Sequence, residues 1–426
     1  MPELIQRERD ETGQGRPSRC PRHARQAGSP RKDGATRIGL KELCSEPFRL
    51  FFPLALFAGV LGVLIWPLVF NGWVERAPGE IHTRLMTLGL FGGFMVGFLG
   101  TSLPRLFKAT PFLWWETFPL CGLFVAASAS YFLGEIGWGD SVCAGGAVVL
   151  SVLLLARFRN RREWPAPSFV LLIPSAACLI AGLAIGEMNR RFEISLEQML
   201  LGRLLLYHGF VLISLLGAGA FLLPRFLRLG LRRRYEAIGP RDPAWFRSAS
   251  LALSAGLFIG VSYLLDAFGL ERIGGALRAL LVLGYLAWEM PVERLRFSRL
   301  GVDPYLVLGL VLIPVGIVCS AWFAGLRVAL SHLEMAGGFG LITLGVATRV
   351  VFGHTGQREM LERFHPWLVL SLGLMILGIA TRIFGEMVPR LMISHYNYGA
   401  YCWIAGALVW GACVLTKVLR PDPEGS

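Results

Sequence analysis

The sequence predicts an all-α protein, a polytopic bundle of about twelve transmembrane helices. Of its 426 residues, 54% are hydrophobic and only 17% are charged, and long apolar stretches recur from Phe48 to Leu419. A hydrocarbon core of about 30 Å needs roughly 20 apolar residues in a helix, and backbone polar groups in lipid must be satisfied within that helix. We expect spans at residues 48–70, 85–106, 111–134, 136–156, 168–187, 199–224, 247–266, 272–290, 303–325, 328–352, 365–387 and 395–418.

The distribution of basic residues predicts the orientation of these spans. The chain has a formal net charge of +13. If the N-terminus is cytoplasmic, the cytoplasmic segments and adjoining span ends contain 31 Lys and Arg residues, against 8 on the outer side and 3 deeper within spans. This bias follows the positive-inside rule. We therefore expect both termini in the cytoplasm and a lipid bilayer as partner, and we do not expect nucleic-acid binding.

Three regions are expected along the chain. Residues 1–46 are rich in Arg, Gly, Ser and Pro and lack an apolar h-region, so they predict a disordered basic cytoplasmic tail instead of a signal peptide. Residues 47–419 form the predicted transmembrane domain, and 420–426 a short C-terminal tail. The eight cysteines are scattered without a Cys-x-x-Cys motif, which indicates neither a disulfide framework nor a thiolate metal site.

A weak internal repeat connects the second, sixth and tenth spans. The second has a glycine at every fourth position and ends in Leu-Pro-Arg at 103–105; the sixth repeats that ending at 223–225, 120 positions later, with Ile213 in place of the middle glycine. The tenth keeps two glycines eight residues apart, Gly337 and Gly345, without the Leu-Pro-Arg ending. This pattern has two interpretations. One is ordinary membrane packing through small residues; the other is three related four-helix units whose second helices meet at a centre.

Histidines inside the spans are the first candidates for chemistry. His82, His332 and His395 lie at the predicted outer starts of the second, tenth and twelfth spans, and His208 lies deeper in the sixth. Ionisable residues in lipid are costly and usually face a bundle interior or a cavity. Neutral imidazole is also a common ligand of haem and transition metals. The alternative is an interfacial polar group or a hydrogen bond to a neighbouring helix.

Methionines accompany three of these histidines at helical spacing. Met335 follows His332 by three residues and Met86 follows His82 by four, so each pair shares a helix face. His395 has Met392 three residues before it. Imidazole with a thioether suits copper, especially cuprous copper, although methionine in apolar helices often serves as core filler.

Two arginines in late spans are candidates for binding a carboxylate. Arg349 and Arg382 each follow an Ala-Thr dipeptide. A guanidinium can bind a carboxylate in bidentate fashion. The propionates of a haem are one such partner, and Glu334 or Glu386 is the alternative.

Several of these residues lie in motifs that resemble the NnrS family. Residues 81–89, Ile-His-Thr-Arg-Leu-Met-Thr-Leu-Gly, and 97–101, Gly-Phe-Leu-Gly-Thr, are similar to the family's His-x-His-Glu-Met segment and the Gly-Phe-Leu-Leu-Thr that follows it. The region from His332 to Gly-His-Thr-Gly at 353–356 resembles the family's tenth helix, and Pro47–Phe52 its opening Arg-Pro-Phe-Phe element. Arg84 and Leu85 stand where the family has its second His and its Glu, so one potential ligand is missing.

The resemblance, which extends from residue 47 to about 415, implies a twelve-helix protein of the bacterial inner membrane that contains haem b and copper. The cofactor-binding candidates are then His82, His208, His332, His354, Arg349 and Arg382, and the metal candidates are His82, Met86, His332, Met335 and His395. A metal site that needed the missing His-Glu pair would be altered, and His208 or His395 is the candidate replacement.

The expected function is binding of nitric oxide at a histidine-held haem, in nitric oxide metabolism or resistance to nitrosative stress. The chain has no His-His dipeptide and few well-buried histidines, which favours binding or sensing over catalytic reduction. The main alternative is a secondary transporter of a small solute, which twelve spans and intramembrane Arg and Glu also suit. Its two halves would be related at roughly 200 residues, not 120. A third possibility is a membrane protein that has lost its ancestral cofactor.

Overall fold

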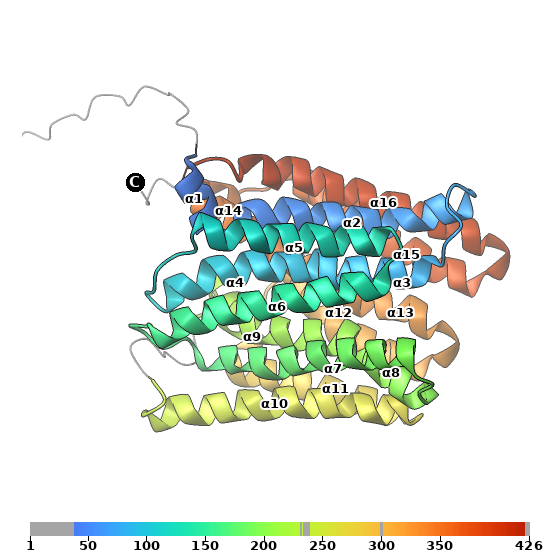
Figure 1. The fold of residues 1–426 in the computed structure, drawn as a ribbon, viewed down its shortest axis with the longest axis horizontal. Helices are drawn as coiled ribbons and strands as arrows, with labels where there is room; N and C mark the ends of the chain where they lie inside the picture. The colour runs from blue at the N-terminus through green and yellow to red at the C-terminus, as the bar shows by residue number, and fades with distance from the viewer. Residues whose placement is uncertain (1–37, 231, 233–238, 299–300, 422–426) are drawn as a thin grey trace, which may run out of the picture. The chain divides into compact units, whose positions relative to one another are not determined.

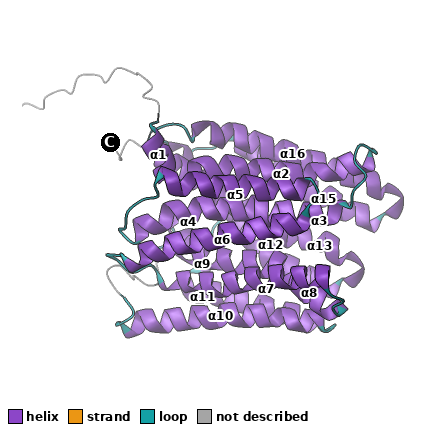
Figure 2. Cartoon of the chain, viewed as in Figure 1, coloured by secondary structure: helices purple, strands orange, loops and turns teal. Residues whose placement is uncertain are grey.

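The computed structural model describes residues 38–230, 232, 239–298 and 301–421. All regular secondary structure in these residues is helical (Figure 2), which confirms the all-α prediction. The described part of the predicted N-terminal tail contains one short helix, α1 (Leu40–Ser45). Cys20 and His23 lie outside the described residues.

Helices lie at each of the twelve predicted positions (Figure 1). Seven passes are single α-helices, and the other five are joined from shorter helical segments. In chain order the passes are α2 (Phe48–Phe70); α3 (Pro78–Arg84), η1 (Leu85–Phe91) and α4 (Gly92–Leu106); α5 (Trp114–Phe132); α6 (Ile136–Arg159); η2 (Pro167–Leu171) and α7 (Leu172–Arg191); α8 (Leu196–Leu204), η3 (Leu205–Gly209) and α9 (Phe210–Phe226); α10 (Pro243–Ala267); α11 (Glu271–Glu289); α12 (Asp303–Trp322); η5 (Ala324–Leu326), α13 (Arg327–His332), η6 (Leu333–Gly340) and α14 (Leu341–His354); α15 (Pro366–Met387); and η8 (Pro389–Leu391), α16 (Met392–Val414) and η9 (Leu415–Lys417).

Ten of these passes, among the described residues, are long and apolar enough to cross a membrane by length and composition. The other two are α5 and α11. The first begins with the polar stretch Trp-Trp-Glu-Thr, and the second contains four charged residues. Both nevertheless pack within the bundle, α5 against α6 and α11 against α10 and α12. The chain is therefore a multi-pass helical membrane protein, in which these two passes depend on their neighbours more than on their own apolarity.

Three passes contain a π-helical segment, and they are the second, sixth and tenth. The segments η1, η3 and η6 begin at Leu85, Leu205 and Leu333, and the first two starts are again 120 positions apart. A π-turn holds an extra residue relative to an α-turn and occurs often at functional sites. Its recurrence in the passes that carry the sequence repeat favours three related units over ordinary small-residue packing.

A glycine on the preceding pass packs against each π-helical segment. A Cβ atom added at Gly62 of α2 would lie 2.8 Å from Leu85 Cβ, and one at Gly182 of α7 would lie 2.6 Å from Leu206 Cβ. Gly316 of α12 faces η6 in the same way. Only a residue without a side chain permits such an approach of two helices. The repeat thus extends to the first, fifth and ninth passes.

The first pass starts beside the end of the last one. Arg49 Nη1 donates hydrogen bonds to the carbonyls of Val418 (2.5 Å) and Arg420 (2.7 Å). An even number of passes returns the chain to the end of the bundle at which it started, as the structure shows in Figure 1. Which side of the membrane this end faces stays a prediction from the basic residues.

A buried carboxylate joins several segments at this end. Glu46 is 3% exposed and accepts hydrogen bonds from Arg49 Nε (2.6 Å), His354 Nδ1 (2.8 Å) and Arg105. Burial alone would raise the pKa of Glu46, but the hydrogen bond from His354 and the charges of His354, Arg49 and Arg105 outweigh it and hold that pKa below its ordinary value of 4.5.

This cluster predicts acid sensitivity. Because the pKa of Glu46 is lower in the folded than in the unfolded state, its stabilising contribution is present above the unfolded pKa and is lost as the pH falls through the folded pKa. We expect Glu46→Gln to reduce the free energy of unfolding in detergent by about 3 kcal/mol at neutral pH, since it removes the nearest and most buried countercharge of the buried Arg49 and leaves only Glu42 at 3.6 Å. The difference from wild type should shrink as the pH falls below 4.5.

The matched control is Glu359→Gln, which disrupts an exposed pair with Arg363. This substitution should change the free energy of unfolding by less than about 1 kcal/mol. A loss of stability in Glu46→Gln that is no larger than in the control, or that is independent of pH, would contradict the assigned role of Glu46.

Candidate functional site

A cavity of about 480 Å³ lies among the second, sixth, tenth, eleventh and twelfth passes and the end of α2. We call it the central cavity. It is near the loops that connect α2 to α3 and α15 to α16, so it is at the opposite end of the bundle from Glu46. Its volume is in the range of small-molecule and cofactor sites. The structure brings six predicted site residues to its wall: His82, Met86, His208, His332, Met335 and Arg382.

His82 and His332 face each other across this cavity. Their ring centroids are 6.5 Å apart and their planes differ by 22°. His82 Nδ1 is 2.9 Å from the carbonyl oxygen of Gly62, and His332 Nδ1 is 2.8 Å from that of Val328. A neutral imidazole that donates from Nδ1 to a carbonyl carries its lone pair on Nε2, which is the arrangement typical of metal-binding histidines.

The third histidine of the cavity is held by a buried carboxylate. His208 belongs to η3, and its Nδ1 is 3.0 Å from Glu334 Oε2 of η6. Glu334 is 2% exposed, and its other oxygen has no hydrogen-bond partner. A carboxylate in this position orients the imidazole. The π-helical segments of the sixth and tenth passes are therefore coupled directly at the cavity wall.

Thioethers supply two further donor atoms of the wall. Met86 and Met335 both line the central cavity, each about one helical turn from a cavity histidine. Within the residues that the structure describes, no three His, Cys, Asp or Glu side chains lie close enough together to hold a metal ion. A metal in this cavity would therefore take at most two ligands from these residue types, with thioethers as the further donors.

The two arginines have separate environments. Arg382 lines the cavity, lies 3.7 Å from the centre of the Tyr396 ring and pairs with Glu386 at 2.9 Å. Its partner is thus one of the two glutamates considered from the sequence. Arg349 pairs with Asp303 at 2.8 Å and is not among the residues that line the cavity.

The structure places the last two candidate histidines away from the central cavity. His354 belongs to the Glu46 cluster at the other end of the bundle. His395 Nδ1 is 3.0 Å from the carbonyl oxygen of Leu391, and its ring packs against Phe384. The ligand roles of these two histidines stay predictions from the sequence.

An ion-pair network beside the cavity was not expected from the sequence. Arg84 is buried and binds Asp140 through Nε (2.8 Å) and Nη2 (3.0 Å), and it also donates to the hydroxyl of Tyr207, which lines the cavity. Asp140 accepts further hydrogen bonds from Tyr131 and Arg190. The residue that replaces the family's second histidine is therefore engaged in a structural pair. In the sequence, the signal for this ion-pair network was the isolated Asp140 in an apolar span.

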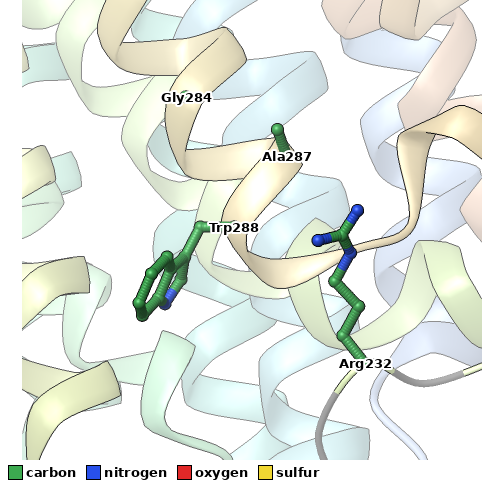
Figure 3. A pocket seen from close by; sticks show the side chains of 4 residues that line it. All are labelled: Arg232, Gly284, Ala287 and Trp288. Carbon is green, nitrogen blue, oxygen red and sulfur yellow. The ribbon is translucent and has the colours of Figure 1, made fainter.

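Another hollow lies at the end of α11, lined by Arg232, Gly284, Ala287 and Trp288. Figure 3 shows the side chains of Trp288 and Arg232 on opposite sides of this helix end. Arg232 pairs with Glu293 at 2.6 Å. None of the lining residues is a His, Met, Cys or carboxylate, so we place the candidate site in the central cavity instead.

Comparisons with known proteins bear on the fold and the family of the chain. No curated protein matches the chain. Among solved structures, the fold is similar to that of a heme-copper terminal oxidase dimer determined by cryo-electron microscopy, with a TM-score of 0.51 and 14% sequence identity over 91% of this chain and 85% of that one. At this identity the likeness concerns the fold alone. Residues 42–421 match the family described as NnrS protein, and the chain therefore belongs to the NnrS family.

Proposed function

We propose that this chain is a haem- and copper-binding protein of the bacterial inner membrane that binds nitric oxide, in nitric oxide metabolism or resistance to nitrosative stress. The observation that carries the proposal is the pair of imidazoles from His82 and His332. When two imidazoles bind the same metal ion from opposite sides, each at a nitrogen–metal distance of about 2 Å, their ring centroids lie roughly 6 Å apart. The observed 6.5 Å suits this arrangement.

Other features of the central cavity wall also suit a haem. Trp66, Phe91 and Trp403 contribute apolar surface, and Arg382 and Arg203 contribute positive charge near the connecting loops. Large apolar surfaces with a few placed polar groups are typical of cofactor sites. Arg382 would attract the propionates of a haem whose iron is held by His82 and His332.

A bound haem would supply an iron that binds a diatomic ligand. The protein's own residues would orient the imidazoles and exclude water. The carbonyls of Gly62 and Val328 fix the tautomers of the two imidazoles, and the apolar wall excludes water. A diatomic ligand would compete with one of the imidazoles for the metal. For copper, the remaining donors are His208, Met86 and Met335, which are of the kind that cuprous copper prefers.

The repeat argues against the transporter alternative. Transporters of that class are built from two related halves around a midplane site, whereas here the π-helical segments and their glycine contacts recur three times. The fold similarity to a heme-copper terminal oxidase supports the same choice.

The proposal predicts a coloured protein. Purified in mild detergent from haem-sufficient cells, the chain should contain iron and copper and show a Soret band that shifts when nitric oxide is added to the reduced form. The visible spectrum and elemental analysis measure this. A colourless, metal-free preparation would instead support the transporter or a protein that has lost its cofactor.

A substitution tests the assignment of the ligands. His332→Ala should remove most of the bound haem, because it deletes one of the two facing imidazoles. His365→Ala is the matched control: this histidine lies away from the central cavity, with its Nε2 3.6 Å from Cys413 Sγ. Haem content per protein is the readout, and equal retention in both variants would refute the assignment.

A further inference from the structure

Two apolar cavities lie in series between the central cavity and the side of the bundle. The middle cavity, of about 70 Å³, is enclosed by α4, α7, α9 and α14. The outer cavity, of about 190 Å³, is enclosed mainly by α4, α5, α6 and α7. Apart from Phe91, neither contains a residue that the proposed cofactor site uses.

Shared side chains separate the three cavities. Met95, Leu99 and Leu172 line both the outer and the middle cavity. Phe91, the last residue of η1, lines both the middle and the central cavity. It is 5% exposed and makes an edge contact with Phe339 at 6.1 Å. The side chains shared between neighbouring cavities are thus all apolar.

The outer cavity reaches the surface between α6 and α7. Ser151 of α6 and Ala176 of α7 line it and are both exposed. The surrounding surface is apolar, with exposed residues on both helices: Val148, Val152, Ile173 and Ile180. In a membrane protein such a surface faces lipid. The two helices lie side by side in Figure 1 and contact each other.

Several hydroxyl groups along this route already have hydrogen-bond partners. Ser151 Oγ donates to the carbonyl of Ala147, Ser175 Oγ to that of Phe210 and Ser214 Oγ to that of Val211. The walls therefore offer little to a water molecule. Apolar cavities of this kind stay dry, and one of about 150 Å³ binds benzene or xenon.

We propose that the outer and middle cavities form a passage through which a small uncharged molecule of diatomic size moves from the bilayer to the central cavity. The identity of that molecule as nitric oxide rests on the proposed function. A small apolar gas enters hydrocarbon readily, whereas an ion or polar solute would lose its hydration in these cavities without new partners. Phe91, which lines both the middle and the central cavity, lies where the passage meets the proposed cofactor site.

Xenon tests the passage without any cofactor. The wild-type protein under xenon pressure should show bound xenon in the outer and middle cavities, by crystallography or xenon NMR. Ala147→Phe fills the outer cavity and should abolish binding there. Val148→Phe, one residue along on the same helix and 62% exposed, should leave it unchanged. Absence of xenon from wild type, or equal binding in both variants, would overturn the proposal.

Kinetics test whether the passage is used. In the reduced, haem-loaded protein, Ala147→Phe should slow nitric oxide association several-fold relative to Val148→Phe, with unchanged final spectra. Ala218→Leu in the middle cavity should act in the same direction, and it replaces Ala147→Phe if that variant fails to fold. Unchanged rates in both would overturn the passage even where the haem binds nitric oxide. A haem-free protein that binds xenon as expected would refute only the proposed function.

Discussion

Three contacts between a glycine and a π-helical segment determine where the histidines of this protein lie. At Gly62, Gly182 and Gly316 the backbone of one pass approaches the next so closely that a Cβ atom would meet the π segment. Because Gly62 lies this close to the second pass, its carbonyl is within hydrogen-bonding distance of His82. The other two contacts position η3 and η6, whose residues His208 and Glu334 bond to each other. The candidate site thus depends on helix packing more than on loop structure.

Most of the fold was predictable from hydropathy, because a helix in lipid must be long, apolar and internally hydrogen-bonded. The 120-residue offset left related units and ordinary small-residue packing open, and the histidine pattern indicated His82 and His332 as candidates, which the structure brings to one cavity. The π-helical segments were not predictable, since they arise where a neighbouring glycine and the local packing favour an extra residue in a turn. Pairs such as Glu46 with His354 join residues far apart in the chain, and no local pattern signals such a contact.

Charge pairing separates structural from functional polar groups inside the bundle. Arg84 pairs with Asp140, Arg157 with Glu116 and Arg278 with Asp266, in each case with the guanidinium group mostly buried. A buried charge without a partner would be strongly destabilising, so these pairs are explained by the fold itself. The imidazoles of His82 and His332 differ, because each makes one hydrogen bond to a backbone carbonyl and keeps a second nitrogen for a ligand.

The polar residues at the two ends of the bundle therefore have different roles. At one end, Glu46, Arg49 and the residues after α16 hold the first and last passes together through hydrogen bonds to a buried carboxylate and to backbone carbonyls. At the other end, the central cavity is lined by imidazoles, thioethers and aromatic rings from passes that belong to all three related units. The apolar cavities open from the side, between α6 and α7. A ligand that arrives from the bilayer would reach the imidazoles without crossing either ionic end, which suits an uncharged gas and no charged solute.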